Sequence, residues 1–457
     1  MIDELEPCEN DTETGINHNW ESIDWGLVMR RIRSGQAELM DLYNNNAHKN
    51  IAWIQQEITR SFEARALAVK LTINSRGAGT PGVDHVRWNS NELKYQAIMD
   101  LNPVQYHSNP YLRKNIPKLY GGVRQLNIPT LSDRAMQNLH RIVLEPIAEC
   151  SADEHSYGFR QGRCSHDALA KCSQELEKGA KWVLEGDIKD CFSGLSHDWL
   201  LANIPMDHDV LSKILMCDVV EYSGYKVRSI TRNEGACQGG PISPVFCNMA
   251  LDGMRNTVKR IDAEAELIRY ADDFIITSRS IKTLQSVLPD IEDFLIKRGL
   301  TLSNAKTMIS DANDGFDFLG CTIKKTSNGV VIEPQEKSVR RLKKKVLDEI
   351  EKHGSSPADI VTKRLDLITR GWSNYYRFYD SEEAFNRIDQ SARALLKHYG
   401  MPDEIEVNRY KASKTPKIKY MPIVTTKNPF EKKSRRYFKK RQLLIAECSF
   451  PWENDCY

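Results

Sequence analysis

The chain has 457 residues, with 64 Lys and Arg against 62 Asp and Glu and a formal net charge of +2. This length suits two to four domains, and 40% hydrophobic with 28% charged residues is typical of a globular protein, not of a disordered or collagen-like chain. The chain has no run of 18 apolar residues, and its acidic N-terminus lacks the apolar segment of a signal peptide. Eleven scattered cysteines without a CxxC motif favour reduced thiols, so we expect a cytoplasmic protein.

The near-zero net charge hides a gradient along the chain. Residues 1–30 carry a net charge of −7, and residues 331–457 carry +9. The acidic residues 1–20 predict a disordered leader, whereas the basic C-terminal quarter is a candidate for phosphate contacts with a nucleic acid. A solvated helix surface is the alternative interpretation of such a charge run.

Hydrophobic spacing predicts the main elements in chain order. Apolar residues recur at helical spacing over 51–66, residues 75–84 form a loop rich in Gly and Pro, and residues 182–187 and 269–278 read as short strands. From 338 onward the pattern turns helical again. There an apolar stripe lies opposite a basic face: Val339, Leu342, Val346 and Ile350 against Arg340, Arg341, Lys343, Lys344 and Lys345.

Three carboxylates stand at the ends of the predicted strands. Asp272 and Asp273 are adjacent within an apolar run, and Asp187 ends the segment WVLEGD. Neighbouring carboxylates in such a setting are costly unless positive charge compensates them. A hairpin turn is one explanation, because Asp is a good turn residue. The other is a divalent metal site, since Mg²⁺ prefers carboxylate oxygens together with substrate phosphates and two such ions catalyse in-line displacement.

A series of further motifs raises the weight of the metal interpretation. YADD within RYADDF (269–274) is weak alone, but it is accompanied by GTPGVDHVRW (79–88), IPKLYGGVRQLNIPTLSDRAMQ (116–137), EPIAECSADEHSYGFRQGRCSHDAL (145–169), VLEGDIKDCFSGLSHDWLLANIP (183–205), ACQGGPISPVFCNMALDGM (236–254), LSNAKT (302–307), GFDFLG (315–320) and GWSNYYRFYDSEEAF (371–385). In this order the motifs resemble those of the reverse transcriptases encoded by group II introns. The resemblance runs from about residue 20 to about residue 399.

The resemblance implies roles for individual residues at the catalytic centre. Asp187, Asp272 and Asp273 would be the catalytic carboxylates holding two Mg²⁺ ions, for which Mn²⁺ is a possible substitute, and the carbonyl of Ile188 would complete one coordination shell. Phe192 follows Asp187 by five residues, and at this position the resemblance implies a residue that selects deoxynucleotides. The alternative is that Phe192 is a core aromatic.

Other roles implied by the resemblance concern the nucleotide and the nucleic acid. Lys118 and Arg124 would contact the phosphates of the incoming nucleotide, which suits a point charge and a forked guanidinium, and Gln238 would brace nucleotide and template. The nucleic-acid-binding residues would be Lys306, Arg340, Arg341, Lys344, Trp372 and Arg377. In the tail segment 432–441 seven of ten residues are basic. The same role would fall there to Lys432, Lys433, Arg435, Arg436, Lys439 and Lys440. Aromatic packing inside a helical domain is the alternative for Trp372.

The sequence also departs from the family pattern. The family usually has Arg-Pro-Leu-Gly where this chain has Arg124 to Asn127, and Thr-Pro-Gln where it has Ala236 to Gln238. Residues 400–457 contain two cysteines and no histidine, so we expect no zinc-bound endonuclease domain of the HNH type there.

The resemblance implies an α+β right-hand polymerase with fingers, a palm built on a small antiparallel sheet and a helical thumb, followed by a helical maturase domain. We expect an acidic leader (1–20), an N-terminal helical extension (21–90), fingers and palm (91–325), thumb and maturase domain (326–400) and a basic tail (401–457). The implied function is RNA-directed DNA synthesis with binding of structured RNA in intron splicing and retrohoming, using a DNA primer or target and deoxynucleoside triphosphates. A domesticated reverse transcriptase that copies a dedicated non-coding RNA, in phage defence or DNA repair, is the alternative.

Overall fold

The computed structural model describes residues 19–117, 123–223, 226–303 and 305–400. They divide into two compact units. Unit 1 contains the chain up to Cys150 with Pro205–Asn233 and Cys237–Ile242, and unit 2 contains Ser151–Ile204, Glu234–Ala236 and the chain from Ser243 onward. In the described residues no helix combines the length and the hydropathy needed to cross a bilayer.

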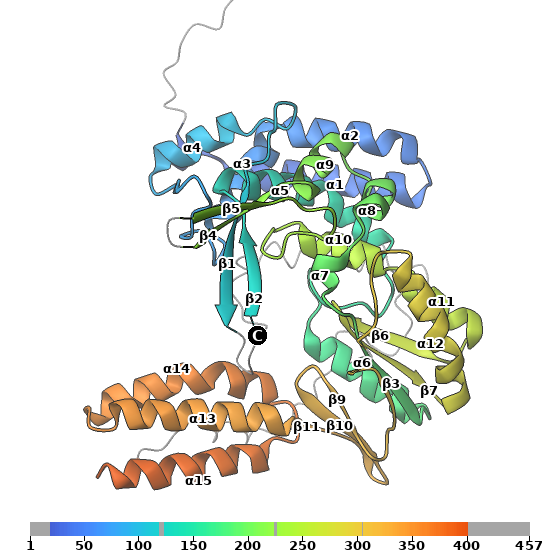
Figure 1. Cartoon of the computed structure of the whole chain (residues 1–457), viewed down its shortest axis with the longest axis vertical. Coiled ribbons are helices and arrows are strands. Elements are labelled where there is room, and N and C mark those ends of the chain that lie inside the picture. Colours follow the sequence, from blue (N-terminus) through green and yellow to red (C-terminus); the bar gives the residue numbers. More distant parts are fainter. Residues whose placement is uncertain (1–18, 118–122, 224–225, 304, 401–457) are drawn as a thin grey trace, which may run out of the picture. The chain divides into compact units, whose positions relative to one another are not determined.

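Unit 1 is built around one buried helix, α5 (Leu131–Cys150), in which 15 of 20 residues are buried. Helices α1, α2 and α3 pack against α5, whose buried side chains include polar ones such as Asp133, Arg134 and Asn138 beside the apolar majority. Side-chain caps define several helix starts, such as Asp24 before α1 and Ser90 before α4. The helical elements of the unit (Figure 1) are η1 (Trp20–Ser22), α1 (Trp25–Asn44), α2 (His48–Arg60), α3 (Phe62–Ile73), α4 (Asn91–Asp100), α5 and α9 (His208–Leu215).

The structure corrects the single helix predicted over 51–66. The segment forms two helices, α2 and α3, that meet at Ser61. Ser61 adopts an extended conformation, its hydroxyl donates to the carbonyl of Ile58, and the same oxygen accepts from the N–H of Ala64. A serine that caps both helices ends the first and starts the second, and periodicity alone does not reveal that break.

A four-stranded sheet completes unit 1, with the order β2-β1-β4-β5. Strands β1 (Tyr111–Pro117) and β2 (Val123–Ile128) are antiparallel, β1 pairs with β4 (Val219–Ser223) in parallel, and β4 is antiparallel to β5 (Lys226–Ile230). The predicted loop at 75–84 contains only turns. Its position is fixed in part by Arg134, whose guanidinium donates to the carbonyls of Gly77 and Thr80.

Unit 2 contains a second four-stranded sheet, entirely antiparallel, with the order β6-β7-β3-β8. Its strands are β3 (Trp182–Asp187), β6 (Glu266–Tyr270), β7 (Asp273–Ser278) and β8 (Met308–Asp311). Strand β7 is almost wholly buried and β-branched at Ile275, Ile276 and Thr277, as a central strand requires. Helices α6 (Ser165–Glu177), α11 (Met254–Ile261) and α12 (Ile281–Ile296) pack on this sheet. The remaining short helices are α7 (Cys191–Gly194), α8 (His197–Asn203) and α10 (Ser243–Leu251).

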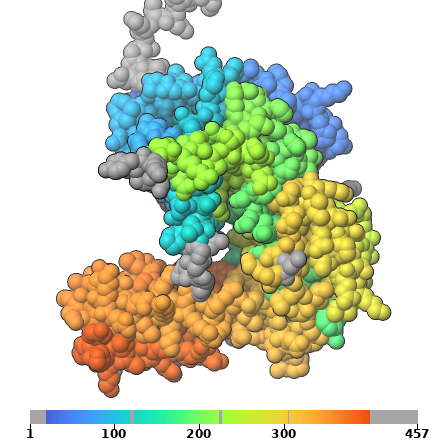
Figure 2. Space-filling view, viewed as in Figure 1, coloured from blue at the N-terminus to red at the C-terminus, as the bar shows by residue number. Residues whose placement is uncertain are grey.

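The last described part of unit 2 is a small sheet and three helices. Strands β9 (Phe316–Phe318), β10 (Cys321–Thr326) and β11 (Gly329–Pro334) form an antiparallel sheet, followed by α13 (Glu336–His353), α14 (Ala358–Tyr376) and α15 (Glu382–His398). The predicted apolar stripe of α13 is buried against α14 and α15, and its basic side chains are exposed. Figure 2 shows the atoms of α13–α15, in orange and red, as one continuous mass.

The α+β fold class predicted from the sequence is therefore confirmed: a small antiparallel palm-type sheet carries helices, and the described C-terminal region is helical.

We predict that Leu342→Ala loosens the α13–α15 helices. Leu342 is buried in their common core, and removing such a side chain costs about 2–5 kcal/mol. Amide hydrogen exchange of α13 should become faster, whereas Lys343→Ala at the neighbouring exposed position should leave it unchanged. Equal exchange in the two variants would contradict this core assignment.

Candidate active site and nucleic-acid-binding surfaces

The three predicted catalytic carboxylates lie at one end of the unit 2 sheet. Asp187 is the last residue of β3, and its register partner on β7 is Asp273. Asp272 lies in the tight turn between β6 and β7, directly after Ala271, which adopts a positive φ of 57°. The segment 269–278, predicted as one strand, therefore consists of the end of β6, this turn and β7. The hairpin turn that the sequence offered as one explanation is present, and the metal site stays a prediction.

The charges at this end of the sheet are crowded. Desolvation of its carboxyl group, followed by repulsion from Asp272 and Asp187, raises the pKa of Asp273 to about 6. The ammonium of Lys306 lies 3.0 Å from Asp187 Oδ2, and this hydrogen bond raises the pKa of Lys306. Three carboxylates, whose repulsion Lys306 and Lys337 offset only in part, form a site that attracts further positive charge.

The residues present suit hard cations by their chemistry. Carboxylate oxygens are the ligands that Mg²⁺ prefers. Ile188 and Leu302 form an antiparallel β-bridge. The hydrogen bonds on either side of it run from the N–H of Lys189 to the carbonyl of Thr301 and from the N–H of Ser303 to the carbonyl of Asp187. Ile188 is therefore in a non-hydrogen-bonded pair, and its carbonyl points away from Leu302. In this conformation no three His, Cys, Asp or Glu side chains of the described residues converge on one point. Lys306 donates a hydrogen bond to one oxygen of Asp187.

Phe192 is half-buried on α7. Its ring meets that of Phe159 edge to face, with 6.2 Å between centroids, and its carbonyl accepts from the N–H of Ala236 at 2.7 Å. Phe192 is thus held in place without being a core residue, which leaves the predicted sugar-selecting role open to test.

Two predicted nucleotide-binding residues come together in unit 1. With its amide oxygen facing the guanidinium, Gln238 accepts from Nη2 and Nε of Arg124 at 2.9 and 3.0 Å, and its amide nitrogen donates to the carbonyl of Gln125. Arg124 itself is exposed on β2. The guanidinium fork is therefore pre-oriented by Gln238. Lys118, the other predicted phosphate contact, lies outside the described residues.

The departures from the family pattern also meet in space. The Cys237 thiol donates to the carbonyl of Asn127 at 3.0 Å, and the N–H of Asn127 donates to the carbonyl of Gln238 at 3.0 Å. A Cβ on Gly239 would lie 2.8 Å from the carbonyl oxygen of Asn127. Positions 127 and 237, which stand 110 residues apart in the chain, thus form one contact beside the Arg124–Gln238 pair.

Sequence reasoning missed the ion network under the Asp272 turn. The side chain of Arg269 is completely buried and donates to Asp252 Oδ1 at 2.7 Å, to Asn248 Oδ1 at 3.0 Å and to the carbonyl of Ala271 at 3.2 Å. Arg160 binds both oxygens of Asp252 at 2.6 and 2.8 Å. The available signal was a lone arginine in the apolar strand LIRY, because a charge in a buried strand needs a partner.

A glycine supports the same turn from the other side. A Cβ on Gly158 would lie 2.3 Å from the backbone nitrogen of Ala271, so no other residue fits there without moving the turn. Asn248 donates from its amide to the carbonyl of Gly158 at 2.9 Å. The positive-φ turn that presents Asp272 is therefore fixed by Arg269, Asn248 and Gly158 together.

The predicted nucleic-acid contacts of unit 2 fall into two groups. Arg340, Arg341, Lys344 and Arg377 are exposed, although Arg340 also pairs with Glu336 at 3.1 Å. Trp372 lies partly inside: its indole N–H donates to Ser338 Oγ, and its ring packs against Tyr376 and Phe385. The basic tail residues Lys432, Lys433, Arg435, Arg436, Lys439 and Lys440 lie outside the described residues.

Comparison with known families matches these features in chain order. Residues 20–101 match the N-terminal domain of reverse transcriptase, residues 115–323 match reverse transcriptase (RNA-dependent DNA polymerase), and residues 339–414 match the group II intron maturase-specific domain. The chain belongs to the group II intron-encoded reverse transcriptase and maturase family. The predicted enzyme class, an RNA-directed DNA polymerase, is confirmed by this domain content.

Relatives of this reverse transcriptase include proteins from bacteria and fungi. Protein YkfC of Escherichia coli is 29% identical over 307 residues, which cover 56% of this chain and 78% of that protein. The group II intron-encoded protein LtrA of Lactococcus lactis is 26% identical, with 64% of this chain and 61% of LtrA covered. An uncharacterized 91 kDa protein in the cob intron of Schizosaccharomyces pombe is 25% identical, with 63% and 46% covered. This chain thus spans less than two thirds of the length of the last two.

We predict that Arg269→Met lowers primer extension at least tenfold, since displacing a catalytic group by about 1 Å can cost ~100-fold in rate. The change releases the carbonyl of Ala271 and leaves Asp252 with Arg160 as its guanidinium partner in the network described above. The matched control is Arg279→Met, which removes an exposed arginine paired with exposed Glu264 and should leave the rate unchanged. Hydrogen exchange of β3 and β7 separates a displaced turn from an unfolded sheet. Undiminished extension by Arg269→Met would show that the network does not position the turn.

Proposed function

We propose that this reverse transcriptase extends a DNA primer on an RNA template by two-metal nucleotidyl transfer. The observation that carries the proposal is the meeting of Asp187, Asp272 and Asp273 at one end of an antiparallel sheet. These carboxylates and the carbonyl of Ile188 would hold two Mg²⁺ ions, which Mn²⁺ could replace. Bound there, the metal supplies Lewis-acid stabilisation of the attacking and leaving oxygens.

The protein's own groups handle the nucleotide and the nearby charge. Lys306 pairs with Asp187 and offsets part of its charge. In unit 1 the Arg124 fork, oriented by Gln238, would bind the triphosphate together with Lys118, because a guanidinium grips phosphate oxygens in pairs. Phe192, held against Phe159, would exclude a ribose 2′-hydroxyl and so favour deoxynucleoside triphosphates.

We further propose that the C-terminal region binds structured RNA and the template–primer duplex. The exposed cations of α13 would contact phosphates without reading sequence, and Arg377, which lies over the ring of Phe378, would stack on or pair with RNA. In this assignment residues 91–325 are fingers and palm and residues 326–400 are thumb and maturase domain. The assignment also includes an acidic leader at 1–20, an N-terminal helical extension at 21–90 and a basic tail at 401–457. We place the protein in the cytoplasm and assign it to intron splicing and retrohoming.

One observation favours a second function. Two of the departures from the family pattern, at Asn127 and Cys237, contact each other beside the nucleotide-binding pair. A paired change at this place suits an enzyme adapted to one dedicated template, such as a non-coding RNA copied in phage defence or DNA repair. Sequencing the RNA that co-purifies with the protein decides between the two: intron RNA supports splicing and retrohoming, and a single unrelated non-coding RNA supports the second function.

We predict that Asp272→Asn abolishes Mg²⁺-dependent primer extension while RNA binding stays near wild type, because the change removes one ligand charge and leaves the basic surfaces intact. The control, Asp290→Asn, alters an exposed carboxylate on α12 and should extend normally. Extension by Asp272→Asn on an RNA template would rule out the catalytic assignment.

A separate prediction concerns the basic tail. Replacing Lys432, Lys433, Arg435, Arg436, Lys439, Lys440 and Arg441 by Gln should weaken RNA binding and flatten its dependence on salt, because each lost phosphate contact removes about 0.7–0.9 from the slope of log K against log salt. Fluorescence anisotropy over a salt series measures this slope. A slope equal to that of wild type would return the tail to the solvated-surface interpretation.

A further inference from the structure

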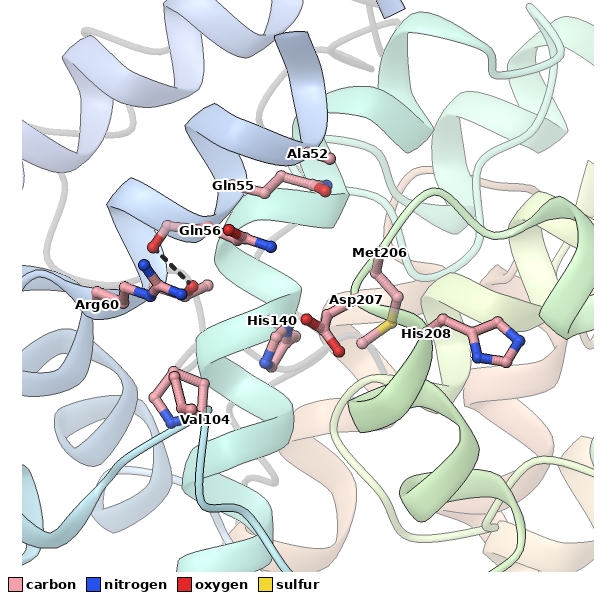
Figure 3. Close-up of a pocket in the computed structure, with 11 residues that line it drawn as sticks. Ala52, Gln55, Gln56, Arg60, Val104, His140, Met206, Asp207 and His208 are labelled. Atoms are coloured by element: carbon pink, nitrogen blue, oxygen red, sulfur yellow. Dashed lines mark hydrogen bonds between the residues drawn. The ribbon is translucent and has the colours of Figure 1, made fainter. Parts of the chain in front are cut away.

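Unit 1 contains a cavity of about 270 Å³ that no part of the proposed reaction uses. Its walls come from α2, from the loop after α4, from α5 and from the segment that starts α9 (Figure 3). Drug-sized ligands occupy pockets of ~300–1,000 Å³, so this cavity suits a smaller group. Its apolar lining includes Pro103, Val104 and Met206, and its polar lining includes Gln56, Arg60, His140 and Asp207.

A buried histidine lines this cavity. His140 is 3% exposed, and its Nε2 atom has no hydrogen-bond partner among the described residues. Burial lowers the pKa of His140 to about 4, and the charge of Asp207 opposes this shift only in part, so the imidazole is neutral at physiological pH. Buried polar atoms are normally hydrogen-bonded, and Nε2 at a cavity wall therefore suits a ligand atom.

Asp207 lies beside His140 on the same cavity (Figure 3). It caps α9, because its Oδ1 oxygen accepts from the N–H of Val210 at 3.0 Å. Its Oδ2 oxygen accepts from no donor within the described residues. The segment that carries it is fixed by Gln55, whose amide donates to the carbonyl of Pro205 at 2.8 Å. A rigidly held carboxylate oxygen thus adds an acceptor for an amino group.

The cavity opens beside an exposed helical face with an aromatic and basic composition. Lys49, Trp53, Gln56 and Arg60 are all exposed on α2, and their spacing of four, three and four residues places them on one side of the helix. Trp53 retains 61% of its surface exposed. A flat aromatic between two cations is the composition of a surface on which single-stranded nucleic acid stacks its bases and places its phosphates.

We propose that this cavity takes one unpaired base of a single-stranded RNA that runs along α2. Asp207 accepts a hydrogen bond from an exocyclic amino group of the base, His140 Nε2 meets a second polar atom, and Met206 and Val104 cover apolar surface. Trp53 stacks on the neighbouring base, and Lys49 and Arg60 contact phosphates. The site prefers a base that carries an amino group, such as cytosine, over uracil, which has none.

The preference for cytosine over uracil follows from hydrogen-bond chemistry. Asp and Glu read cytosine by accepting from its N4 amino group. Uracil has a carbonyl oxygen at the same position. This oxygen and the Asp207 carboxylate both carry negative charge and would repel each other. This inference rests on the proposed function, because an RNA-directed polymerase must hold RNA, but it concerns a site separate from the carboxylate cluster of unit 2.

The test measures binding of fluorescein-labelled ten-nucleotide oligo(rC) and oligo(rU) to the full chain by anisotropy over a salt series. Wild type should bind oligo(rC) about tenfold more tightly, in the range of one base contact. Asp207→Asn keeps a good helix cap but loses the charge, and it should bring the ratio close to one. Trp53→Ala should weaken both oligonucleotides about tenfold, as loss of one stacking platform does.

Arg60→Ala supplies a second readout, because loss of one phosphate contact on a single strand lowers the salt slope by about 0.7. Arg30→Ala, which removes an exposed arginine of α1 outside the cavity lining, is the control and should keep the wild-type slope and ratio. The inference requires both the lost base preference in Asp207→Asn and the lower slope in Arg60→Ala; absence of either overturns it.

Primer extension on a long RNA template separates this failure from failure of the proposed function. If wild type extends the primer while Asp207→Asn and Arg60→Ala bind like wild type, the cavity inference alone is wrong. If wild type neither extends the primer nor binds the oligonucleotides, both are wrong.

Discussion

The antiparallel register between β3 and β7 is the constraint on which the proposed catalytic centre depends. It sets Asp187 opposite Asp273, and the turn that joins β6 to β7 adds Asp272. Sheet pairing thus places three carboxylates at one end of the sheet, and desolvation of Asp273, followed by repulsion from Asp272 and Asp187, raises the pKa of Asp273 to about 6. Hydrophobic packing along buried β7 holds the strands in this register against the repulsion. This charge state favours a bound cation, because a cation would relieve that repulsion.

Buried positive charge on the other side of the turn makes this arrangement rigid. Arg269 and Arg160 share Asp252, and Arg269 also binds the carbonyl of Ala271. Such a network is costly to break, because each member left alone would be a buried charge. Close contact at Gly158 removes the space into which the turn could relax. Catalysis needs donor groups held within a fraction of an ångström, and this network supplies that precision.

Unit 1 shows the same principle with hydrogen bonds in place of ion pairs. Gln238 orients the Arg124 guanidinium, and the Asn127–Cys237 contact ties the strand to the glycine-containing loop. The departures from the family pattern therefore do not weaken this corner of the molecule. At these positions the Cys237 thiol donates to the carbonyl of Asn127, and the N–H of Asn127 donates to the carbonyl of Gln238. The proposed base-binding cavity belongs to this unit as well.

The sequence by itself predicted Asp187, Asp272 and Asp273 as catalytic carboxylates, a role that stays a prediction. It determined the strand at 182–187, the buried stripe of α13 and the family, because these features lie in short segments with local periodicity or fixed spacing. It did not determine the break at Ser61, where a side-chain cap overrides a continuous apolar pattern. Tertiary structure alone decided the Arg269–Asp252 network, the meeting of positions 127 and 237, and the cavity at His140. Each of these depends on contacts between residues far apart in the chain, whose distances are set by strand register and helix packing and leave no local trace in the sequence.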